Sequence, residues 1–300
     1  MQQSERPASD RWVGVALIII SAAAFGTLGI FARLSYADGA TPLTVLMLRF
    51  ALAAPVMLAL MAFRRAPIPR GRILVGLILM GGVGYVGQSF SYFTAVSLAS
   101  PGLVALILYT YPAMVTVLAA LFLHERLSAL TVIVLVVALA GTALTLGPAI
   151  ATARSQPLGI GFALAAAIIY AVYILVGSRI TPRAGALPSS TVIIVTAAAV
   201  FGSVVAWRGP TFPTSPAGWL AIVAIALIST VLPIVTFFAG LARVGPTAAS
   251  TLSTLEPVVT VLLATLLLAD PLAPIQLVGG ALILVAAVVL ALARGPQKPG

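Results

Sequence analysis

The sequence predicts an all-α membrane protein in which ten transmembrane helices form two inverted five-helix repeats, with both termini in the cytoplasm. Three observations support this prediction: an apolar composition, ten apolar segments of membrane-spanning length, and a weak internal repeat. Of the 300 residues, 61% are hydrophobic and 7% are charged, whereas a soluble domain carries about 25% charged residues. Most of the protein surface is therefore expected to face lipid.

Ten segments approach the length of a membrane span, because a bilayer core about 30 Å thick requires roughly 20 apolar residues in a helix. The segments are 13–34, 43–63, 73–97, 101–122, 129–147, 158–178, 189–207, 217–241, 246–268 and 274–293. Spanning strands are not expected, since the segments are too long and lack strict alternation of apolar and polar residues. Several segments begin at a proline, whose missing N–H leaves no helical hydrogen bond unmade at that place.

The distribution of basic residues predicts the orientation of the helices. If the N-terminus lies in the cytoplasm, twelve basic residues fall on the cytoplasmic side and two or three on the opposite side. The twelve are Arg6, Arg11, Arg64, Arg65, Arg70, Arg72, Arg126, Arg179, Arg183, Arg243, Arg294 and Lys298; the others are Arg154 and Arg208, with Arg33 at a helix end. Because cytoplasmic loops are enriched in lysine and arginine, topology explains the net charge of +10 without a nucleic-acid partner.

The chain matches itself weakly when it is shifted by 145 residues. The shift superimposes Pro101 on Pro246 and Pro112 on Pro257 without a gap, together with several leucines and alanines. Matches between leucine and alanine carry little weight in so apolar a chain, but two prolines in register favour a duplication.

The repeat predicts one membrane domain made of residues 1–147 and residues 148–300, each with five spans. Because five is an odd number, the second copy must enter the membrane upside down. Inverted repeats are typical of secondary transporters, in which a site at the repeat interface opens alternately to each side. The alternatives are a membrane channel or facilitator for small solutes, an exporter of cationic or lipophilic drugs, and a structural membrane protein.

The ten-span plan, the duplicated halves and the sequence LEPVV at 255–259 resemble the drug/metabolite transporter superfamily, and more narrowly its EamA-type group. The group has a Glu-Pro in the ninth helix, here Glu256-Pro257, whereas the first-half counterpart is Tyr111-Pro112. The resemblance implies an exporter of amino acids or other metabolites across a bacterial inner membrane. The aromatic content along the expected path is similar to that of aromatic amino acid exporters.

Glu256 and Arg49 are the two charged residues that fall well inside predicted spans. A charge in the membrane normally faces a cavity or a partner, so Glu256 is expected to be a substrate or proton site, or else a structural or protonated acid. Straight helices of 1.5 Å rise per residue place the two side chains at depths that differ by about 5 Å. We therefore expect Arg49 and Glu256 to pair or to line one cavity, unless Arg49 extends to the outer headgroups.

Tyr85, Gln88, Ser89 and Tyr92 follow the spacing i, i+3, i+4 and i+7, which places them on one face of the third helix. Aromatic rings with polar ends suit a cavity for amphipathic solutes such as amino acids, although hydrogen bonding between helices is the alternative. The further aromatic candidates for the solute pathway are Tyr109, Tyr111, Tyr170 and Tyr173.

Four residues are expected to bend helices or to let them slide. Pro112 and Pro257 each remove a backbone hydrogen bond within a span, and for Pro257 the carbonyl set free lies near Ser253. Gly84 and Gly87 belong to a G-x-G-x-x-G pattern, which in a nucleotide-binding protein follows a strand and opens a helix. Because the pattern lies inside a predicted span, the glycines are interpreted as a surface for close helix packing.

The sequence contains none of the motifs expected of an enzyme or an ATP-driven pump. It has no cysteine and a single histidine, His124, so neither a metal site nor a cofactor is expected. The turn at His124-Glu125-Arg126 is either a gate latch or a solvated turn with a local ion pair. The expected partners are a small-molecule substrate and the lipid bilayer; the oligomeric state stays open and is compatible with a monomer.

Overall fold

The structure, a computed structural model, describes residues 8–99, 101–125, 127–147, 156–269 and 271–292. This part of the chain contains helices, turns and irregular segments but no strand. Ten helical stretches within it are long and apolar enough to cross a membrane: Ser9–Ala37, Pro42–Phe63, Gly71–Ala95, Leu103–Leu123, Ala129–Leu146, Pro157–Ala184, Ala186–Arg208, Pro216–Val244, Pro246–Leu268 and Pro274–Leu292. The prediction of ten spans is confirmed.

Some predictions concern residues outside the described part of the chain. They include the boundary between the two repeats at residues 147 and 148, of which only Gly147 is described, and the basic residues Arg6, Arg126, Arg154, Arg294 and Lys298.

Five spans are single helices and five are interrupted. The single helices are α3 (Pro42–Phe63), α8 (Ala129–Leu146), α9 (Pro157–Ala184), α10 (Ala186–Arg208) and α15 (Pro274–Leu292). The first span consists of α1 (Ala8–Gly26) and α2 (Leu28–Ala37), and the fourth of α6 (Pro101–Leu108) and α7 (Tyr111–Leu123).

The other three interrupted spans contain a short segment of different helical pitch. The third consists of α4 (Gly71–Leu79), the π-helical η1 (Met80–Tyr85) and α5 (Val86–Leu98). The eighth consists of α11 (Pro216–Ala226), the π-helical η3 (Leu227–Val231) and α12 (Leu232–Val244). The ninth consists of α13 (Pro246–Leu252), the 3₁₀ turn η4 (Ser253–Leu255) and α14 (Glu256–Leu268).

The interruption of the ninth span follows from Pro257. Because proline has no N–H, it cannot bond the carbonyl four residues earlier, which belongs to Ser253. In the structure the N–H of Glu256 takes that carbonyl in a tighter turn, and α14 begins at Glu256. The first half contains a comparable break, where Pro112 stands second in α7 after the turn at Tyr109 and Thr110.

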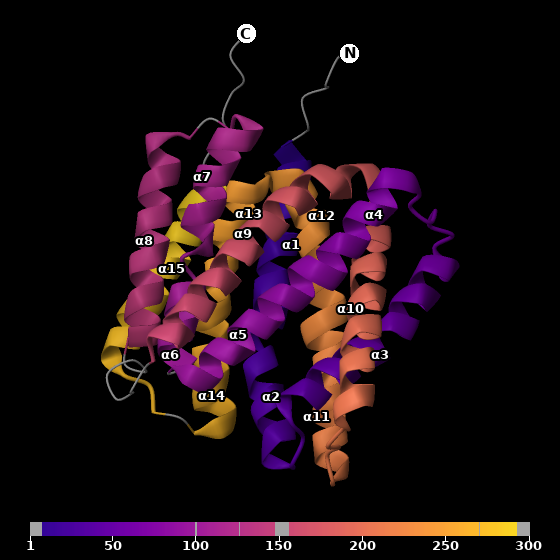
Figure 1. Ribbon diagram of the computed structural model, residues 1–300. Helices are drawn as coiled ribbons and strands as arrows, with labels where there is room; N and C mark the ends of the chain where they lie inside the picture. The colour runs from indigo at the N-terminus through magenta and orange to yellow at the C-terminus, as the bar shows by residue number, and fades with distance from the viewer. Residues whose placement is uncertain (1–7, 100, 126, 148–155, 270, 293–300) are drawn as a thin grey trace.

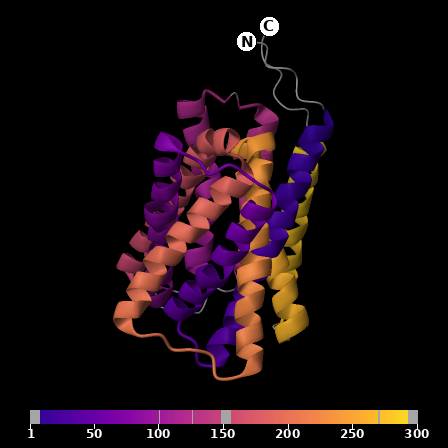
Figure 2. The ribbon, with the colours of Figure 1, turned by 90° about the vertical axis from the view of Figure 1, so that its right-hand side faces the viewer.

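The helices form one bundle in which the main packing pairs join the first half of the chain to the second. Helix α1 packs along α12, α3 along α10, α5 along α9, and α8 along α15. Figure 1 shows α8 and α15 on the left, α3 and α10 on the right, and α5 and α9 crossing the front. Figure 2 shows the segment 209–215 running beneath the bundle from α10 to α11. The interior therefore lies between the two halves.

The start of α1 and the end of α15 lie on the same side of the bundle. Arg11, near the start of α1, donates a hydrogen bond from Nη2 to the carbonyl of Leu290, near the end of α15, at 3.0 Å. This side is the upper one in Figure 1.

The distribution of polarity is that of a membrane protein. Large apolar side chains such as Leu220 and Leu266 are 70% and 77% exposed on the outside of the bundle, while Arg49 is only 4% exposed in its interior. Trp12 and Trp219 lie near the starts of α1 and α11, and Trp207 lies at the end of α10. These are the places that an aromatic belt at the two membrane interfaces would occupy.

Helices α8 and α15 approach closely at Gly141 and Gly279. A Cβ atom added to Gly279 would lie 2.5 Å from the carbonyl oxygen of Gly141 and 2.5 Å from Oγ1 of Thr145. Small residues allow such backbone approach between helices in a membrane. The pair α8–α15 thus depends on the absence of a side chain at Gly279.

We predict that Gly279→Ala destabilises the protein, because overpacking a tight contact costs about 1–3 kcal/mol. The matched control is Gly202→Ala in α10, where an added Cβ meets no atom within 4 Å. Thermal unfolding of the purified protein in detergent should show a lower midpoint for Gly279→Ala and little change for Gly202→Ala. Equal midpoints for the two variants would contradict the packing argument.

Candidate functional site

Five tyrosines from both halves of the chain form a continuous row of ring contacts in the interior, which we call the tyrosine chain. In order they are Tyr85, Tyr173, Tyr170, Tyr111 and Tyr109. Successive ring centroids lie 6.0, 6.1, 4.6 and 6.2 Å apart. Tyr109, Tyr111 and Tyr173 are buried, so in this conformation they face other side chains more than open space.

Arg49 lies at the Tyr85 end of the tyrosine chain. Its Nη2 donates to the hydroxyl of Tyr85 at 2.9 Å and to the carbonyl of Ser229 at 3.4 Å, and its Nε donates to Oγ1 of Thr230 at 2.6 Å. The guanidinium also lies 5.0 Å from the ring centre of Phe50, close enough for a cation–π interaction. Arg49 therefore bonds within the bundle and does not extend to the outer headgroups.

The hydrogen-bond acceptors of Arg49 belong to the two π-helical segments. Tyr85 is the last residue of η1, and Ser229 and Thr230 lie in η3. Tyr85 and Thr230 are 145 residues apart, which is the offset of the internal repeat. A single arginine thus connects equivalent places in the two halves.

Glu256 lies near the other end of the tyrosine chain. As the first residue of α14 it follows the break at η4, and its carboxylate lies close to the hydroxyl of Tyr109. It also lies within electrostatic range of the phenol groups of Tyr92, Tyr111 and Tyr170. The break in the ninth span therefore brings the carboxylate to a cluster of phenols.

Arg49 and Glu256 do not form the ion pair that we considered from the sequence. Their charges interact through space, but among the described residues no hydrogen bond or salt bridge joins the two side chains. The physical reason is competition, since Arg49 is held by Tyr85, Ser229 and Thr230. The alternative expectation, that both residues line one cavity, stays a prediction.

The predicted stripe on the third helix divides between two environments. Tyr85 belongs to the tyrosine chain, and Tyr92 packs with Phe93 at a centroid distance of 5.6 Å while interacting electrostatically with Glu256. Ser89 donates to Oε1 of Gln88 at 3.5 Å. Within the described chain, the side chains of Gln88 and Ser89 make no hydrogen bond to Arg49, Glu256 or the tyrosines.

The predicted sliding surface of the third helix faces α9, with different tightness at the two glycines. A Cβ atom added to Gly84, inside η1, would lie 3.2 Å from the ring of Tyr173, whereas one added to Gly87 would lie 3.9 Å from Ile169. Gly84 therefore allows the close approach of the helix to the tyrosine chain, and Gly87 has ordinary room.

Several residues of this cluster were not singled out from the sequence. Ser229 and Thr230 accept hydrogen bonds from Arg49, and Tyr36 lies within electrostatic range of Arg49 and Tyr92. Serine and threonine in an apolar segment commonly serve contacts between helices, so their presence alone does not indicate a functional site. The offset of 145 residues from Tyr85 is the signal that could have identified Thr230.

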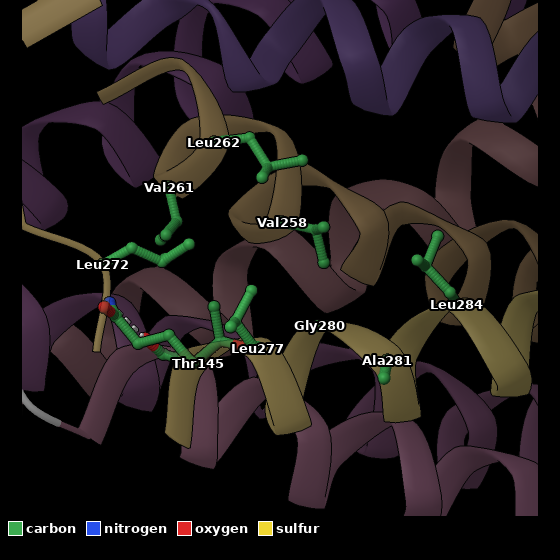
Figure 3. Close-up of a pocket in the computed structure, with 10 residues that line it drawn as sticks. Thr145, Val258, Val261, Leu262, Leu272, Leu277, Gly280, Ala281 and Leu284 are labelled. Atoms are coloured by element: carbon green, nitrogen blue, oxygen red, sulfur yellow. Dashed lines mark hydrogen bonds between the residues drawn. The ribbon is translucent and has the colours of Figure 1, made fainter. Parts of the chain in front are cut away.

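A separate shallow depression of about 180 Å³ lies between α8, α14 and α15. Figure 3 shows it lined mainly by aliphatic side chains. The lining residues are Thr145, Val258, Val261, Leu262, Leu272, Gln276, Leu277, Gly280, Ala281 and Leu284. It contains none of the residues predicted for the solute pathway and no charged group, so it does not suit a polar solute.

Polar contacts join a loop to the opposite half of the chain at each end of the bundle. On one side, the loop after α2 meets segment 209–215: Oδ2 of Asp38 accepts from the N–H of Ser215 at 2.8 Å, and Oδ1 accepts from Thr214 at 3.1 Å. These hydrogen bonds, that from Ser215 first, lower the pKa of Asp38.

On the other side, Oε2 of Glu125 accepts from the hydroxyl of Thr247, in the first turn of α13, at 3.0 Å. Burial raises the pKa of Glu125, and the bond from Thr247 opposes the rise. Glu125 thus links the loop after α7 to the second half, as a gate latch would. A local ion pair with Arg126 lies outside the described residues.

Comparison with known proteins identifies the family. The sequence matches the EamA-like transporter family twice, over residues 12–147 and over residues 157–292. The chain belongs to the EamA-like transporter family. The two matched segments are offset by 145 residues, as in the repeat predicted from the sequence.

Two individual proteins are similar to this EamA-like transporter over most of its length. The "Uncharacterized transporter YcbK" of Bacillus subtilis (strain 168) is 25% identical over 278 residues, which cover 89% of this chain and 88% of that protein. A protein of known crystal structure superimposes with a TM-score of 0.80 at 24% identity, covering 92% of this chain and 95% of its own. The first similarity indicates a bacterial transporter relative, and the second shows the fold.

We predict that Tyr85→Phe destabilises the transporter, because it leaves one N–H of a buried cation without its acceptor. Hydrogen bonds to charged groups contribute about 1.5–3 kcal/mol. The matched control is Tyr173→Phe, since the Tyr173 hydroxyl makes no hydrogen bond to a described residue.

Thermal unfolding in detergent should therefore show a lower midpoint for Tyr85→Phe than for Tyr173→Phe. In an Arg49→Leu background the difference between the two substitutions should disappear, as expected for groups that act through one interaction. A difference that persists without Arg49 would show that the hydroxyl of Tyr85 acts through something else.

We predict that Glu125→Gln stabilises the transporter at neutral pH but not in acid. The pKa of Glu125 is raised above its ordinary value of 4.5. The protonated carboxyl therefore stabilises the folded state, and this contribution is complete at pH values below that ordinary pKa. The contribution is lost as pH rises through the raised pKa. Glutamine keeps an acceptor for Thr247 without the buried charge.

The measurement is the unfolding midpoint of Glu125→Gln relative to wild type, from about pH 4 to about pH 8. The relative midpoint should rise with pH. Asp38→Asn is the control of opposite sign, because the lowered pKa of Asp38 makes its charged form stabilising. A Glu125→Gln midpoint that runs parallel to wild type would contradict the argument.

Proposed function

We propose that this protein is a secondary transporter that exports small metabolites, amino acids in particular, by alternating access across a bacterial inner membrane. Membership of the EamA-like family supports transport of small solutes. The single observation that carries the proposal further is the interior cluster of Arg49, Glu256 and the tyrosine chain. Charged and phenolic groups at this depth are costly in lipid and normally serve a solute or ion path.

The broken helices support alternating access. Transporters with inverted repeats form their sites where spans are discontinuous near the middle of the membrane. Here the third and eighth spans both contain π-helical segments, and the fourth and ninth are both interrupted just before Pro112 and Pro257. We propose that Pro112, Pro257, Gly84 and Gly87 serve the movement of these spans past their neighbours.

Both termini are proposed to lie in the cytoplasm. Arg11 and Arg243 lie at the end of the bundle where α1 begins, with Arg243 paired to Asp10 at 3.0 Å. Arg208, at the end of α10, is one of the few basic residues assigned to the opposite side. This asymmetry supports cytoplasmic loops on the side of Arg11, with Glu125 at the inner gate and Asp38 at the outer one.

The tyrosines support amino acids with aromatic or other apolar side chains as the solutes. Phenol rings offer apolar faces together with hydrogen-bonding ends. The same rings beside Glu256 also suit an organic cation, since aromatic faces and a carboxylate both attract positive charge. Export of cationic, lipophilic compounds is therefore the second candidate function.

We predict that liposomes containing the purified protein accumulate a labelled aromatic or apolar amino acid, and that protein-free liposomes do not. An unlabelled amino acid inside the liposomes should accelerate entry of the labelled one. The reason is that a site that alternates between the two sides returns to the outside with an amino acid bound, whereas a channel would show no acceleration. Glu256→Gln should reduce the flux.

Stimulation of the flux by a pH gradient would indicate proton antiport, and absence of stimulation would indicate facilitated diffusion. No flux of any amino acid would exclude this solute class, and flux of tetraphenylphosphonium would then favour the second candidate.

A further inference from the structure

The charge of Arg49 has no acidic partner in the described part of the chain. Four acidic residues are described there, and three of them are engaged near the ends of the bundle: Asp10 with Arg243, Asp38 with Ser215 and Thr214, and Glu125 with Thr247. The fourth is Glu256, which shares the interior with Arg49 but does not bond it. Among the described residues, the acceptors of Arg49 are neutral oxygen atoms.

The guanidinium of Arg49 is fixed yet incompletely bonded. Its Nε and Nη2 donate three hydrogen bonds to Tyr85, Ser229 and Thr230, while no acceptor among the described residues bonds Nη1. A guanidinium offers five N–H donors in a planar fork suited to carboxylate. The unbonded nitrogen is the natural contact for a carboxylate supplied from outside the chain.

Glu256 is incompletely bonded in the corresponding way. Its half-buried carboxylate lies close to the hydroxyl of Tyr109 and forms no salt bridge with a described residue. The tyrosines with which it interacts, Tyr92, Tyr111 and Tyr170, bring phenol rings that attract cations. An ammonium group is the complement of this environment.

Separated opposite charges in one interior call for a ligand that carries both charges. Burying an ion without a partner costs several kcal/mol, and the tether of Arg49 prevents the two residues from relieving that cost by pairing. Glu256 lies within electrostatic range of Arg49, so a molecule that carries a carboxylate and an ammonium group on one carbon would satisfy both residues, with its apolar side chain against the tyrosine rings.

We propose that Arg49 and Glu256 are the two poles of a zwitterion site, in which the carboxylate of an α-amino acid binds Arg49 and its ammonium group binds Glu256. The inference rests on the proposed function and specifies the chemistry of its substrate. Because a carboxylate that binds Nη1 also reaches Nη2, it would compete with Tyr85 and Ser229 for that nitrogen, so binding would also loosen the connection between η1 and η3.

The test uses phenylalanine and two analogues that each lack one of its charged groups: phenylalaninamide lacks the carboxylate, and 3-phenylpropionate lacks the ammonium group. Each unlabelled probe competes with labelled phenylalanine for flux in liposomes, and each is also tested for thermal stabilisation of the purified protein. In wild type, both analogues should be about tenfold to hundredfold weaker than phenylalanine.

Each variant should lose discrimination for one of the two charged groups of phenylalanine. Arg49→Gln should bind phenylalanine and phenylalaninamide about equally while still rejecting 3-phenylpropionate. Glu256→Gln should bind phenylalanine and 3-phenylpropionate about equally while still rejecting the amide. The control Arg208→Gln, at an exposed arginine at the end of α10, should keep both preferences.

Several results would overturn the proposal. Equal binding of all three probes to wild type would do so without any variant, so a variant that fails to fold does not leave the question open. An Arg49→Gln protein that keeps the preference for phenylalanine over its amide would also refute it. These outcomes leave amino acid transport intact, whereas tetraphenylphosphonium flux without any phenylalanine flux or stabilisation would refute both the zwitterion site and the amino acid substrate.

Discussion

The interior of this protein is organised around the burial of one positive charge. A buried guanidinium that lacks acceptors costs far more than one hydrogen bond, because its charge is desolvated as well. The chain provides acceptors for Arg49 at two places where the α-helical pattern is already relaxed. In η3 the hydroxyl of Thr230 donates to the carbonyl of Ile225, five residues earlier, at 2.7 Å, and it also accepts from Arg49. The π-helical turn thus orients the acceptor, and Arg49 holds the turn in place.

The same contact explains why the two halves of the chain belong to one unit. Arg49 stands on α3 in the first half, and the hydroxyls of Tyr85 and Thr230 meet it from equivalent places in the two halves. The tyrosine chain continues this connection, since Tyr173 and Tyr170 come from α9 and Tyr111 and Tyr109 from the fourth span. Packing between the halves is therefore polar at its centre and apolar at its periphery, where α8 meets α15. A polar centre is able to exchange partners, whereas a close-packed apolar contact is not.

The sequence predicts the spans well because hydrophobic length is a local property of the chain. It also predicts the break at Glu256-Pro257, since the missing N–H of proline acts within one turn. The ion pair between Arg49 and Glu256 could not be judged in the same way. The estimate of depth along straight helices took no account of the π-helical turns, and the competing acceptors Ser229 and Thr230 lie about 180 residues away in sequence. The acceptor that an arginine bonds is determined by the tertiary structure, so it cannot be predicted from the spacing of residues along a helix.

The contacts at the two ends of the bundle differ in kind from those in its interior. Asp38 and Glu125 each join a loop to the opposite half through hydrogen bonds to hydroxyl or backbone donors, with no basic partner among the described residues at those bonds. Such contacts lie near the ends of the bundle, where water is able to replace them, and in the proposed transport cycle they would break when an end opens. Two conformational states of a protein differ by on the order of a few kcal/mol, and a ligand shifts such an equilibrium only by its differential affinity for the two states. In the proposed alternating-access cycle, a substrate carboxylate that displaces a neutral acceptor of Arg49 would supply that differential affinity where the two halves meet.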